Sequence, residues 1–335
     1  MKLANGVEIP KVEVLTSPVP FPPQHVHPYL VLGDEPILVD TGVRSEAAWI
    51  ALGKELKGFG LEIKDIRHIL VTHAHLDHFG QAKRIKDVSG CKVYANRLEI
   101  PQLERRHVAH RTLEAPYLQF FREWGAPDSL LMRMVQGDDM SAAMMEAVSV
   151  DVPLEDGVPF TAGGVKFRPV WVPGHAIGHM VYIVDDWRVM FSADHLLPDI
   201  SPVPLLNFPD PLKKEKTRSY IDFLASLDKV ENEKIQVAFP SHGDPILDHR
   251  ELIAGYRLHG RKRSLKVLRI LSENPPLTAF EVAKKMFGDD RAQMLVYLVL
   301  SEAVGHLELL EQEGKIRIER RGELLYYSAD SKETA

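Results

Sequence analysis

The sequence has almost no cysteine. Cys91 is the only one in 335 residues, which excludes a framework of internal disulfide bonds and suggests a reducing compartment. No apolar run reaches the roughly 18 residues that a membrane-spanning helix needs. Residues 1–6 lack the apolar stretch of a secretory signal. These absences predict a soluble cytoplasmic protein with no membrane partner.

An excess of basic charge is also missing. With 41 Lys and Arg against 47 Asp and Glu, the formal net charge is −6, so the overall balance favours neither nucleic-acid nor membrane-surface binding. The apolar content of 45% is enough for a large core and for more than one domain. Histidine, in contrast, is abundant: the chain has 15, and several are clustered.

Short apolar runs, separated by Gly, Pro or Asp, dominate the first 245 residues. They predict strands at residues 29–33, 36–40, 68–72, 92–95, 165–172, 180–184, 189–192 and 235–239. Helical periodicity lies between them, at about residues 45–58, 79–87 and 212–228. Because strands and helices alternate in two successive sets, we expect an α/β fold in which two sheets pack face to face with helices outside.

Residues 97–147 are poor in strand patterns and predict an inserted helical segment. Its apolar residues have two interpretations that remain open. They form the core of the insert, or they form a flexible wall over the active site, since methionine adapts to irregular ligands. The residues concerned are Leu130, Leu131, Met132, Met134, Met140, Met144 and Met145.

The last part of the chain predicts a second domain. A helix is expected at residues 264–273, and Thr278 with Glu281 forms a capping box for the next one. A long helix follows, with Leu295, Leu298, Val299, Leu307 and Leu310 at helical spacing, and Gly314 ends it. Residues 315–319 and 324–328 then form a hairpin. This pattern predicts a catalytic domain at 1–258 and a small winged-helix domain at 259–335.

A cluster of metal-ligand residues directly follows the predicted strand at 68–72. His73 and His75, two residues apart in an extended chain, project to the same side and can share one metal ion. Asp77 and His78 lie where the chain turns into a helix, and they can face a second ion. Neutral imidazoles and a carboxylate suit Zn²⁺ or another late first-row ion.

Three more candidate ligands stand at the ends of predicted strands. His175 lies in the block Pro-Gly-His-Ala-Ile-Gly-His at residues 173–179. Asp194 follows the strand at 189–192, and His242 follows the strand at 235–239. Each alone is most simply a loop residue, but together they can complete a site for two ions.

With these motifs the sequence resembles the metallo-β-lactamase superfamily. The matches are His73-x-His75-x-Asp77-His78, the Pro-Gly-His block, Asp194 after an apolar strand, His242 before a glycine, and Asp40 within Val-Asp-Thr-Gly. The resemblance covers roughly residues 10–250. It implies an αββα metallo-β-lactamase sandwich with the site at one edge.

The resemblance also implies a role for each matched residue. One metal ion would be held by His73, His75 and His175, the other by Asp77, His78 and His242, and Asp194 would bridge them. The two divalent ions are expected to be zinc, with iron or manganese as alternatives. A hydroxide shared by the ions would be the nucleophile. Asp194 and Asp77 are therefore the predicted catalytic residues, the first holding the ions together and the second orienting the hydroxide.

Three neighbours of these ligands lie outside the predicted ligand set. Asp40 either fixes the orientation of a ligand or is a turn-forming aspartate. His179 is not expected to be a ligand, because the family pattern uses the first histidine of its block. His195 is expected to support a ligand or to face the substrate.

Three functions remain open. Histidine at position 75 argues against flavodiiron oxygen reductases, and Asp194 points to relatives of glyoxalase II, lactonases and nucleases. The preferred hypothesis is hydrolysis of a small ester, thioester or lactone. The alternative is an endoribonuclease that cleaves single-stranded RNA, because a winged helix after the catalytic domain resembles the β-lactamase-like protein 2 group, which includes a mitochondrial endoribonuclease. A winged-helix DNA-binding regulator with an inert metal site is disfavoured, because the ligand set is complete.

The charges of the C-terminal domain favour a small-molecule substrate over RNA. The long helix presents acidic residues where a DNA-reading helix presents basic ones: Glu302, Glu308, Glu311 and Glu313. Basic residues cluster before it and on the hairpin, at Arg261, Lys262, Arg263, Arg317, Arg320 and Arg321. We therefore expect this domain to pack against the catalytic domain or to form a homodimer contact.

Overall fold

The first of two large sheets lies in the N-terminal half. The computed structural model describes residues 9, 11–104, 115–209 and 214–330. Six strands pair in the order β1-β4-β5-β6-β7-β8. They are β1 (Val12–Val14), β4 (Tyr29–Leu32), β5 (Pro36–Val39), β6 (His68–Leu70), β7 (Lys92–Asn96) and β8 (Val152–Leu154). Strands β5 to β8 run parallel, because helices such as α1 (Glu46–Gly58) and α3 (Ala82–Ser89) return the chain between them.

The second sheet has five strands in the order β13-β12-β11-β10-β9. They are β9 (Phe160–Ala162), β10 (Val165–Trp171), β11 (Met180–Val184), β12 (Val189–Ala193) and β13 (Val237–Pro240). Neighbours are antiparallel except β12 and β13, which are parallel and joined through α7 (Ser219–Glu231). A short separate pair is formed by β2 (Ser17–Pro18) and β3 (His25–Val26).

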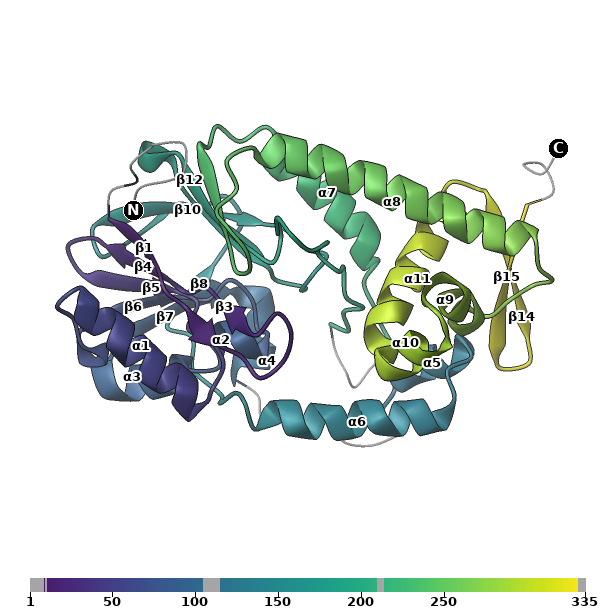
Figure 1. Cartoon of the computed structure of the whole chain (residues 1–335), viewed down its shortest axis with the longest axis horizontal. Helices are drawn as coiled ribbons and strands as arrows, with labels where there is room; N and C mark the ends of the chain where they lie inside the picture. Colours follow the sequence, from purple (N-terminus) through teal and green to yellow (C-terminus); the bar gives the residue numbers. More distant parts are fainter. Residues whose placement is uncertain (1–8, 10, 105–114, 210–213, 331–335) are drawn as a thin grey trace.

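The two sheets form the predicted αββα sandwich (Figure 1). Alternate residues of a strand face opposite sides of its sheet. Thus Tyr29 lies in the core between the sheets, whereas Leu30 lies in the outer core with α1 and α3. In the second sheet Tyr182 faces inward and Ile183 packs with α7. Both faces of each sheet are therefore buried, which explains why the strands read as short, continuous apolar runs.

Each predicted strand of the sandwich has a counterpart, but one helix was misplaced. The helix expected at 212–228 begins only at Ser219. Before it, Thr217 N–H donates to the Asn207 carbonyl at 3.0 Å, so the chain is held in a loop at this point. Lys216 forms an ion pair with Glu308 in the C-terminal part. The residues just before Ser219 therefore form a packed connection and not a helix; residues 210–213 lie outside the described ranges.

The C-terminal part contains four helices and a hairpin. They are α8 (His249–Ser272), α9 (Ala279–Phe287), α10 (Asp289–Met294), α11 (Val296–Gln312), β14 (Ile316–Arg321) and β15 (Leu324–Ala329). The capping box of Thr278 and Glu281 and the antiparallel hairpin are confirmed. The long helix that was expected next is α11, which carries Leu298, Val299, Leu307 and Leu310 and ends just before Gly314. The short helix α10 between Gly288 and Leu295 was not expected. The assignment of these elements to a winged helix stays a prediction.

Helix α8 is longer than the sequence predicted. It begins at His249, where the Asp248 side chain accepts a hydrogen bond from Glu251 N–H at 2.9 Å, and runs for 24 residues. Its first half places Ile253 in the outer core of the sandwich. Its second half places Val267 in the C-terminal core. The predicted boundary between residues 258 and 259 therefore falls inside a continuous helix, and the domain division stays a prediction.

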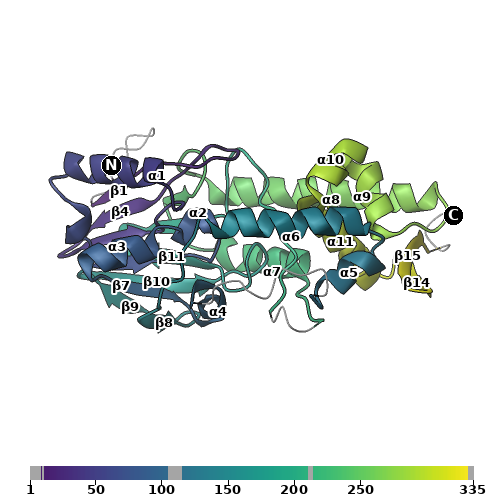
Figure 2. The same ribbon diagram turned by 90° about the horizontal axis from the view of Figure 1, so that it is seen from below.

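The segment expected as an insert joins the two parts. It contains η2 (Arg97–Glu99), α4 (Ile100–Glu104), α5 (Leu118–Glu123) and α6 (Asp128–Ala142). Helix α6 runs from the sandwich to the C-terminal helices (Figures 1 and 2). Leu130, Leu131 and Met134 pack in the C-terminal core, so for them the core interpretation holds. The side chain of Met140 lies outside the described residues.

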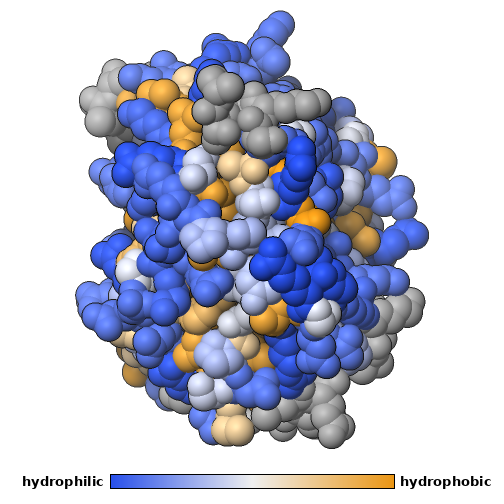
Figure 3. Space-filling model, turned by 90° about the vertical axis from the view of Figure 1, so that its right-hand side faces the viewer, coloured by the Kyte–Doolittle hydropathy of each residue, from blue (hydrophilic) through white to orange (hydrophobic). Residues whose placement is uncertain are grey.

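The C-terminal part also packs directly on the chain around Leu206 and Arg218. Ser301 Oγ accepts a hydrogen bond from Leu206 N–H at 3.0 Å, and Tyr297 donates its hydroxyl hydrogen to the Leu206 carbonyl. Arg218 donates to the Glu308 carbonyl at 2.8 Å. On the end of the molecule shown in Figure 3, hydrophilic residues predominate among those coloured. Within the described ranges, none of the helices is both long enough and apolar enough to cross a bilayer.

Candidate metal centre

The seven predicted ligands converge at one edge of the sandwich. The loop after β6 carries four of them and continues into the short helix α2 (Leu76–Phe79). His175, Asp194 and His242 follow β10, β12 and β13, which all run in the same direction. Because their carboxyl ends meet at the same edge, residues far apart in sequence come together there. Their side chains form two groups, namely His73, His75, His175 and Asp194, and Asp77, His78 and His242.

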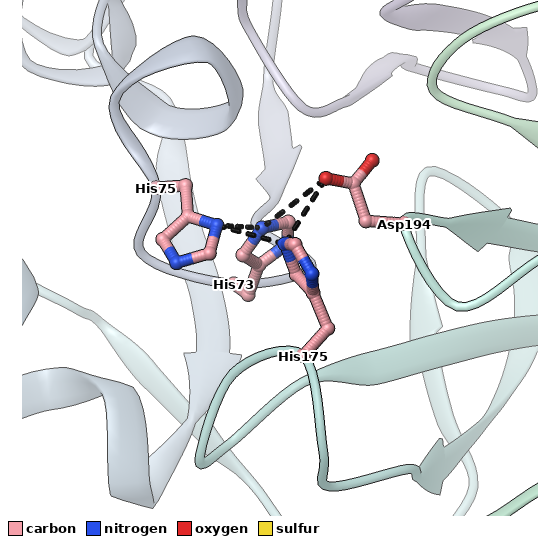
Figure 4. A group of neighbouring side chains, drawn as sticks. All are labelled: His73, His75, His175 and Asp194. Carbon is pink, nitrogen blue, oxygen red and sulfur yellow. Dashed lines mark hydrogen bonds and ion pairs between the residues drawn. The ribbon is translucent and has the colours of Figure 1, made fainter. Parts of the chain in front are cut away.

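In the first group three ring nitrogens point at a common centre (Figure 4). His75 Nδ1 lies 2.8 Å from His73 Nε2 and 3.0 Å from His175 Nε2. Asp194 Oδ2 lies 3.1 Å from His175 Nε2 and 4.0 Å from His73 Nε2. Nitrogen ligands bound to one tetrahedral zinc lie roughly 3.3 Å apart, given Zn–N distances of about 2.0–2.1 Å. The spacing in this group is therefore close to that of a metal-binding cluster.

The second group lies on the other side of Asp194. His78 Nε2 is 3.8 Å from Asp77 Oδ1, and His242 Nε2 is 3.6 Å from Asp77 Oδ2. Asp194 reaches this group as well, with Oδ2 3.5 Å from His78 Nε2 and Oδ1 3.8 Å from His242 Nε2. The carboxylate of Asp194 thus stands between the two clusters, and Ser241 Oγ donates a hydrogen bond to its Oδ1.

Hydrogen bonds behind the histidines fix which nitrogen faces the centre. His78 Nδ1 lies 2.8 Å from Asp40 Oδ2, and because a carboxylate only accepts, Nδ1 carries the proton. His175 Nδ1 donates to the Val203 carbonyl at 2.9 Å, and His242 Nδ1 donates to the His25 carbonyl at 2.8 Å. Each of these rings, when neutral, therefore presents an unprotonated Nε2 to the centre, as a metal ligand must.

Asp40 also organises the loop that bears the ligands. It is buried at a φ of 59° and accepts hydrogen bonds from Thr72 N–H at 2.9 Å and Thr72 Oγ1 at 2.7 Å. Because that hydroxyl gives its hydrogen to Asp40, it can only accept from His73 Nδ1, 3.1 Å away. Asp40 therefore orients both His73 and His78, so of the two interpretations left open, support of ligand orientation is the one that its contacts favour.

The electrostatics of the centre call for a cation. Burial lowers the pKa of His75 to about 3, with His175 adding to the shift, so the ring is neutral. Burial also lowers the pKa of His78, but Asp194, Asp77 and Asp40 together raise it well above its ordinary value. His78 Nε2 is buried and makes no hydrogen bond within the described residues. Buried carboxylates that attract positive charge, beside a neutral His75 and the unused Nε2 of His78, fit a divalent metal ion.

His179 and His195 lie outside both groups. His179 is fully buried, and within the described ranges neither of its ring nitrogens has a hydrogen-bond partner. Its ring centroid is 4.7 Å from that of His73, so it packs behind a ligand. The ring of His195 packs on Phe223, with centroids 5.5 Å apart.

Sequence reasoning missed several groups that orient the ligands, among them two backbone carbonyls. Val203 and His25 orient His175 and His242 through their carbonyl oxygens. The ring of His25 itself belongs to neither group. A backbone carbonyl is present in every residue, so no choice of amino acid signals this role.

Several known proteins resemble this chain over most of its length. The chain is 26% identical over 321 residues to "Probable metallo-hydrolase YqjP" of Bacillus subtilis, covering 94% of this chain and 97% of that protein. It is 26% identical to "Beta-lactamase-like protein 2 homolog" of Drosophila melanogaster, and the match covers 88% of this chain and 85% of that protein. It is 24% identical to "Atrochrysone carboxyl ACP thioesterase" of Aspergillus terreus, and the match covers 91% of this chain and 80% of that protein.

A solved structure and a family sequence profile also match most of this chain. The crystal structure of a metallo-beta-lactamase family protein from Thermus thermophilus superposes with a TM-score of 0.78 at 28% identity, covering 96% of this chain and 99% of the other. The sequence profile of the metallo-beta-lactamase superfamily matches residues 22–242. Since this match spans more than half of its length, the chain belongs to the metallo-beta-lactamase superfamily.

Proposed function

We propose that the chain is a hydrolase that works with two divalent metal ions. One ion would be held by His73, His75 and His175, and the other by Asp77, His78 and His242. The observation that carries this proposal is the position of Asp194, whose two oxygens face both clusters at 3.1–4.0 Å. A carboxylate in that position suits a bridge. The nitrogen-rich donor set favours zinc, with iron or manganese as alternatives.

When bound, such ions would acidify water towards a pKa of ~7 and polarise the carbonyl or phosphoryl oxygen of the substrate. The protein supplies the geometry. Asp77 faces His78 and His242, and its carboxylate can accept a hydrogen bond from the attacking water and orient it. Asp194 fixes the separation of the two clusters. Cys91 is buried and burial raises the pKa of its thiol, so it does not serve as a nucleophile.

The proposed substrate is a small ester, thioester or lactone. The relative from Aspergillus terreus is named as a thioesterase, which supports this substrate class. The basic side chains that would favour RNA are largely engaged in ion pairs within the protein. Arg317 pairs with Asp330 at 2.9 Å, Arg320 with Glu123 at 3.3 Å and Arg321 with Glu319 at 2.7 Å. Because a neighbouring carboxylate offsets the charge of each arginine, these side chains attract phosphates less strongly than unpaired arginines would.

The test is an activity screen of the metal-loaded protein on thioesters, lactones, phosphodiesters and single-stranded RNA. We expect turnover of a thioester or lactone and no cleavage of RNA, with the metal-stripped protein as the background for each substrate. RNA cleavage without ester turnover would establish the endoribonuclease alternative. Inactivity on all classes by protein that carries both ions would instead favour a regulator with an inert site.

The two substrate hypotheses also differ at the hairpin. We predict that replacing Arg317, Arg320 and Arg321 together with glutamine leaves kcat/KM on a thioester or lactone within about twofold, because exposed ion pairs contribute little. The measurement is kcat/KM across a range of salt concentrations. If these arginines contacted phosphates instead, the parent would lose RNA cleavage steeply with salt, and each lost contact would flatten that slope by roughly one counterion.

Asp40 gives a further prediction. In Asp40→Asn the new NH₂ group would face donors on His78 or Thr72, so the correct tautomer of His78 would no longer be enforced. We expect metal affinity to fall by about 10- to 100-fold, the usual effect of losing such a partner. Titration with zinc against a chromophoric chelator measures it. Asp34→Asn, in the turn between β4 and β5, is the control and is expected to bind like the parent.

A further inference from the structure

Glu99 is a buried carboxylate outside the proposed ligand set. It ends η2, directly after β7, where Asn96 Oδ1 accepts a hydrogen bond from Leu98 N–H at 3.0 Å and starts the turn. Its residue exposure is only 2%. Burying an ionisable carboxylate is unfavourable unless hydrogen bonds compensate, so its partners show what it is for.

Each oxygen of Glu99 accepts a backbone hydrogen bond from a different ligand-bearing loop. Oε2 accepts from Ala74 N–H at 2.8 Å, and Ala74 lies between the proposed ligands His73 and His75. Oε1 accepts from Gly178 N–H at 2.5 Å, in the loop that carries His175. One side chain therefore links two segments that are about a hundred residues apart in sequence.

The second loop is shaped to approach Glu99 closely. A Cβ atom at position 178 would lie 2.8 Å from both Cγ and Oε1 of Glu99, nearer than a Cβ atom can come. Glycine at this position therefore permits the contact. It also explains the second glycine of the block Pro-Gly-His-Ala-Ile-Gly-His, which no proposed ligand accounts for.

We propose that Glu99 is a positioning residue that fixes the distance between the two loops of the first metal group. The separation it controls is the 3.0 Å between His75 Nδ1 and His175 Nε2. Because the two loops belong to opposite sheets, relative movement of the sheets changes this separation directly. Glu99 ties the loops together at their backbones, close to the rings, and leaves the ring nitrogens free. This inference rests on the metal centre proposed above.

The test uses Glu99→Gln in the full-length protein. Glutamine keeps the volume but has one accepting oxygen, and its NH₂ group would face one of the two N–H donors. We expect amide hydrogen exchange in the metal-free protein to become at least about tenfold faster in segments 73–76 and 176–179. We also expect the affinity for the first metal equivalent to fall by about 10- to 100-fold, the effect typical of lost support to a ligand.

Two further variants make the test decisive. Glu104→Gln is the matched control, because Glu104 Oε1 also accepts a backbone hydrogen bond, from Val150 N–H at 3.0 Å, away from the ligands. Gly178→Ala forces the same loops apart without changing Glu99. It therefore provides the same test if Glu99→Gln does not fold. We expect Gly178→Ala to reproduce both effects and Glu104→Gln to show neither. Unchanged exchange in both loops, or equal changes in the control, would overturn the role of Glu99; a parent that binds no metal would overturn the centre itself.

Discussion

Replacing Asp194 with alanine is expected to lower kcat/KM by at least about a thousandfold, the upper range for removing a group that stabilises a transition state. The reason is its position: its two oxygens face both proposed metal groups, so the variant loses one ligand from each side at once. Steady-state kinetics and the metal content of the same preparation measure the two consequences together.

Asp194→Asn separates the charge from the shape. The amide fills the same space but is neutral, so we expect it to lose nearly as much activity and metal as Asp194→Ala. Circular dichroism should show the parent's secondary structure in both variants, since Asp194 lies in a loop after β12 and contributes no apolar packing. An asparagine variant that keeps two ions and more than a tenth of the parent's kcat/KM would contradict the bridging role.

Stripping the metal ions with a chelator is expected to abolish activity, and restoring about two equivalents per chain is expected to recover it. Seven candidate ligands exceed what one tetrahedral ion uses. The ions should also raise the melting temperature, because a ligand at a thousand times its dissociation constant stabilises the folded state by about 4 kcal/mol. Elemental analysis, calorimetry and activity of the stripped and reloaded protein provide the measurements.

The stoichiometry decides between one and two sites. A content that stays at or below one ion per chain under metal-replete conditions, with full activity, would refute the dinuclear proposal. In that case the residues of the second group, Asp77, His78 and His242, would have to act as acid–base or binding groups. Alanine variants of His242 and His75 would then differ sharply in metal content.

Most residues of the candidate site could be predicted from the spacing of the potential ligands in the sequence. His73 and His75 alternate in an extended chain, and Asp194 and His242 each follow an apolar strand, so local patterns alone place these side chains at strand ends. That the strand ends meet follows from strand direction in an α/β fold. The grouping found in the structure, which puts Asp77 and His78 in a different group from His73 and His75, is the grouping that the resemblance implied.

Other features could not be predicted because they depend on long-range packing. Glu99 looks like an ordinary charged residue in a helical segment, and only the folded chain brings it to Ala74 and Gly178. The first half of α8 was missed although Leu252, Ile253 and Tyr256 stand at helical spacing, because Gly255 and Gly260 interrupt the pattern. Gly260 has a packing reason: a Cβ atom there would lie 2.0 Å from the Tyr220 hydroxyl oxygen.

Helix α8 has a consequence for how such a protein can change over time. Its 24 residues extend for about 36 Å at 1.5 Å per residue, beginning in the outer layer of the sandwich and ending in the C-terminal core. Loss of the chain after residue 267 would expose apolar residues of α5 and α6, such as Phe121 and Leu131, because they pack in the same core as Val267. Gene fusion or loss at this point is therefore disfavoured, and the two parts are expected to be inherited as one unit.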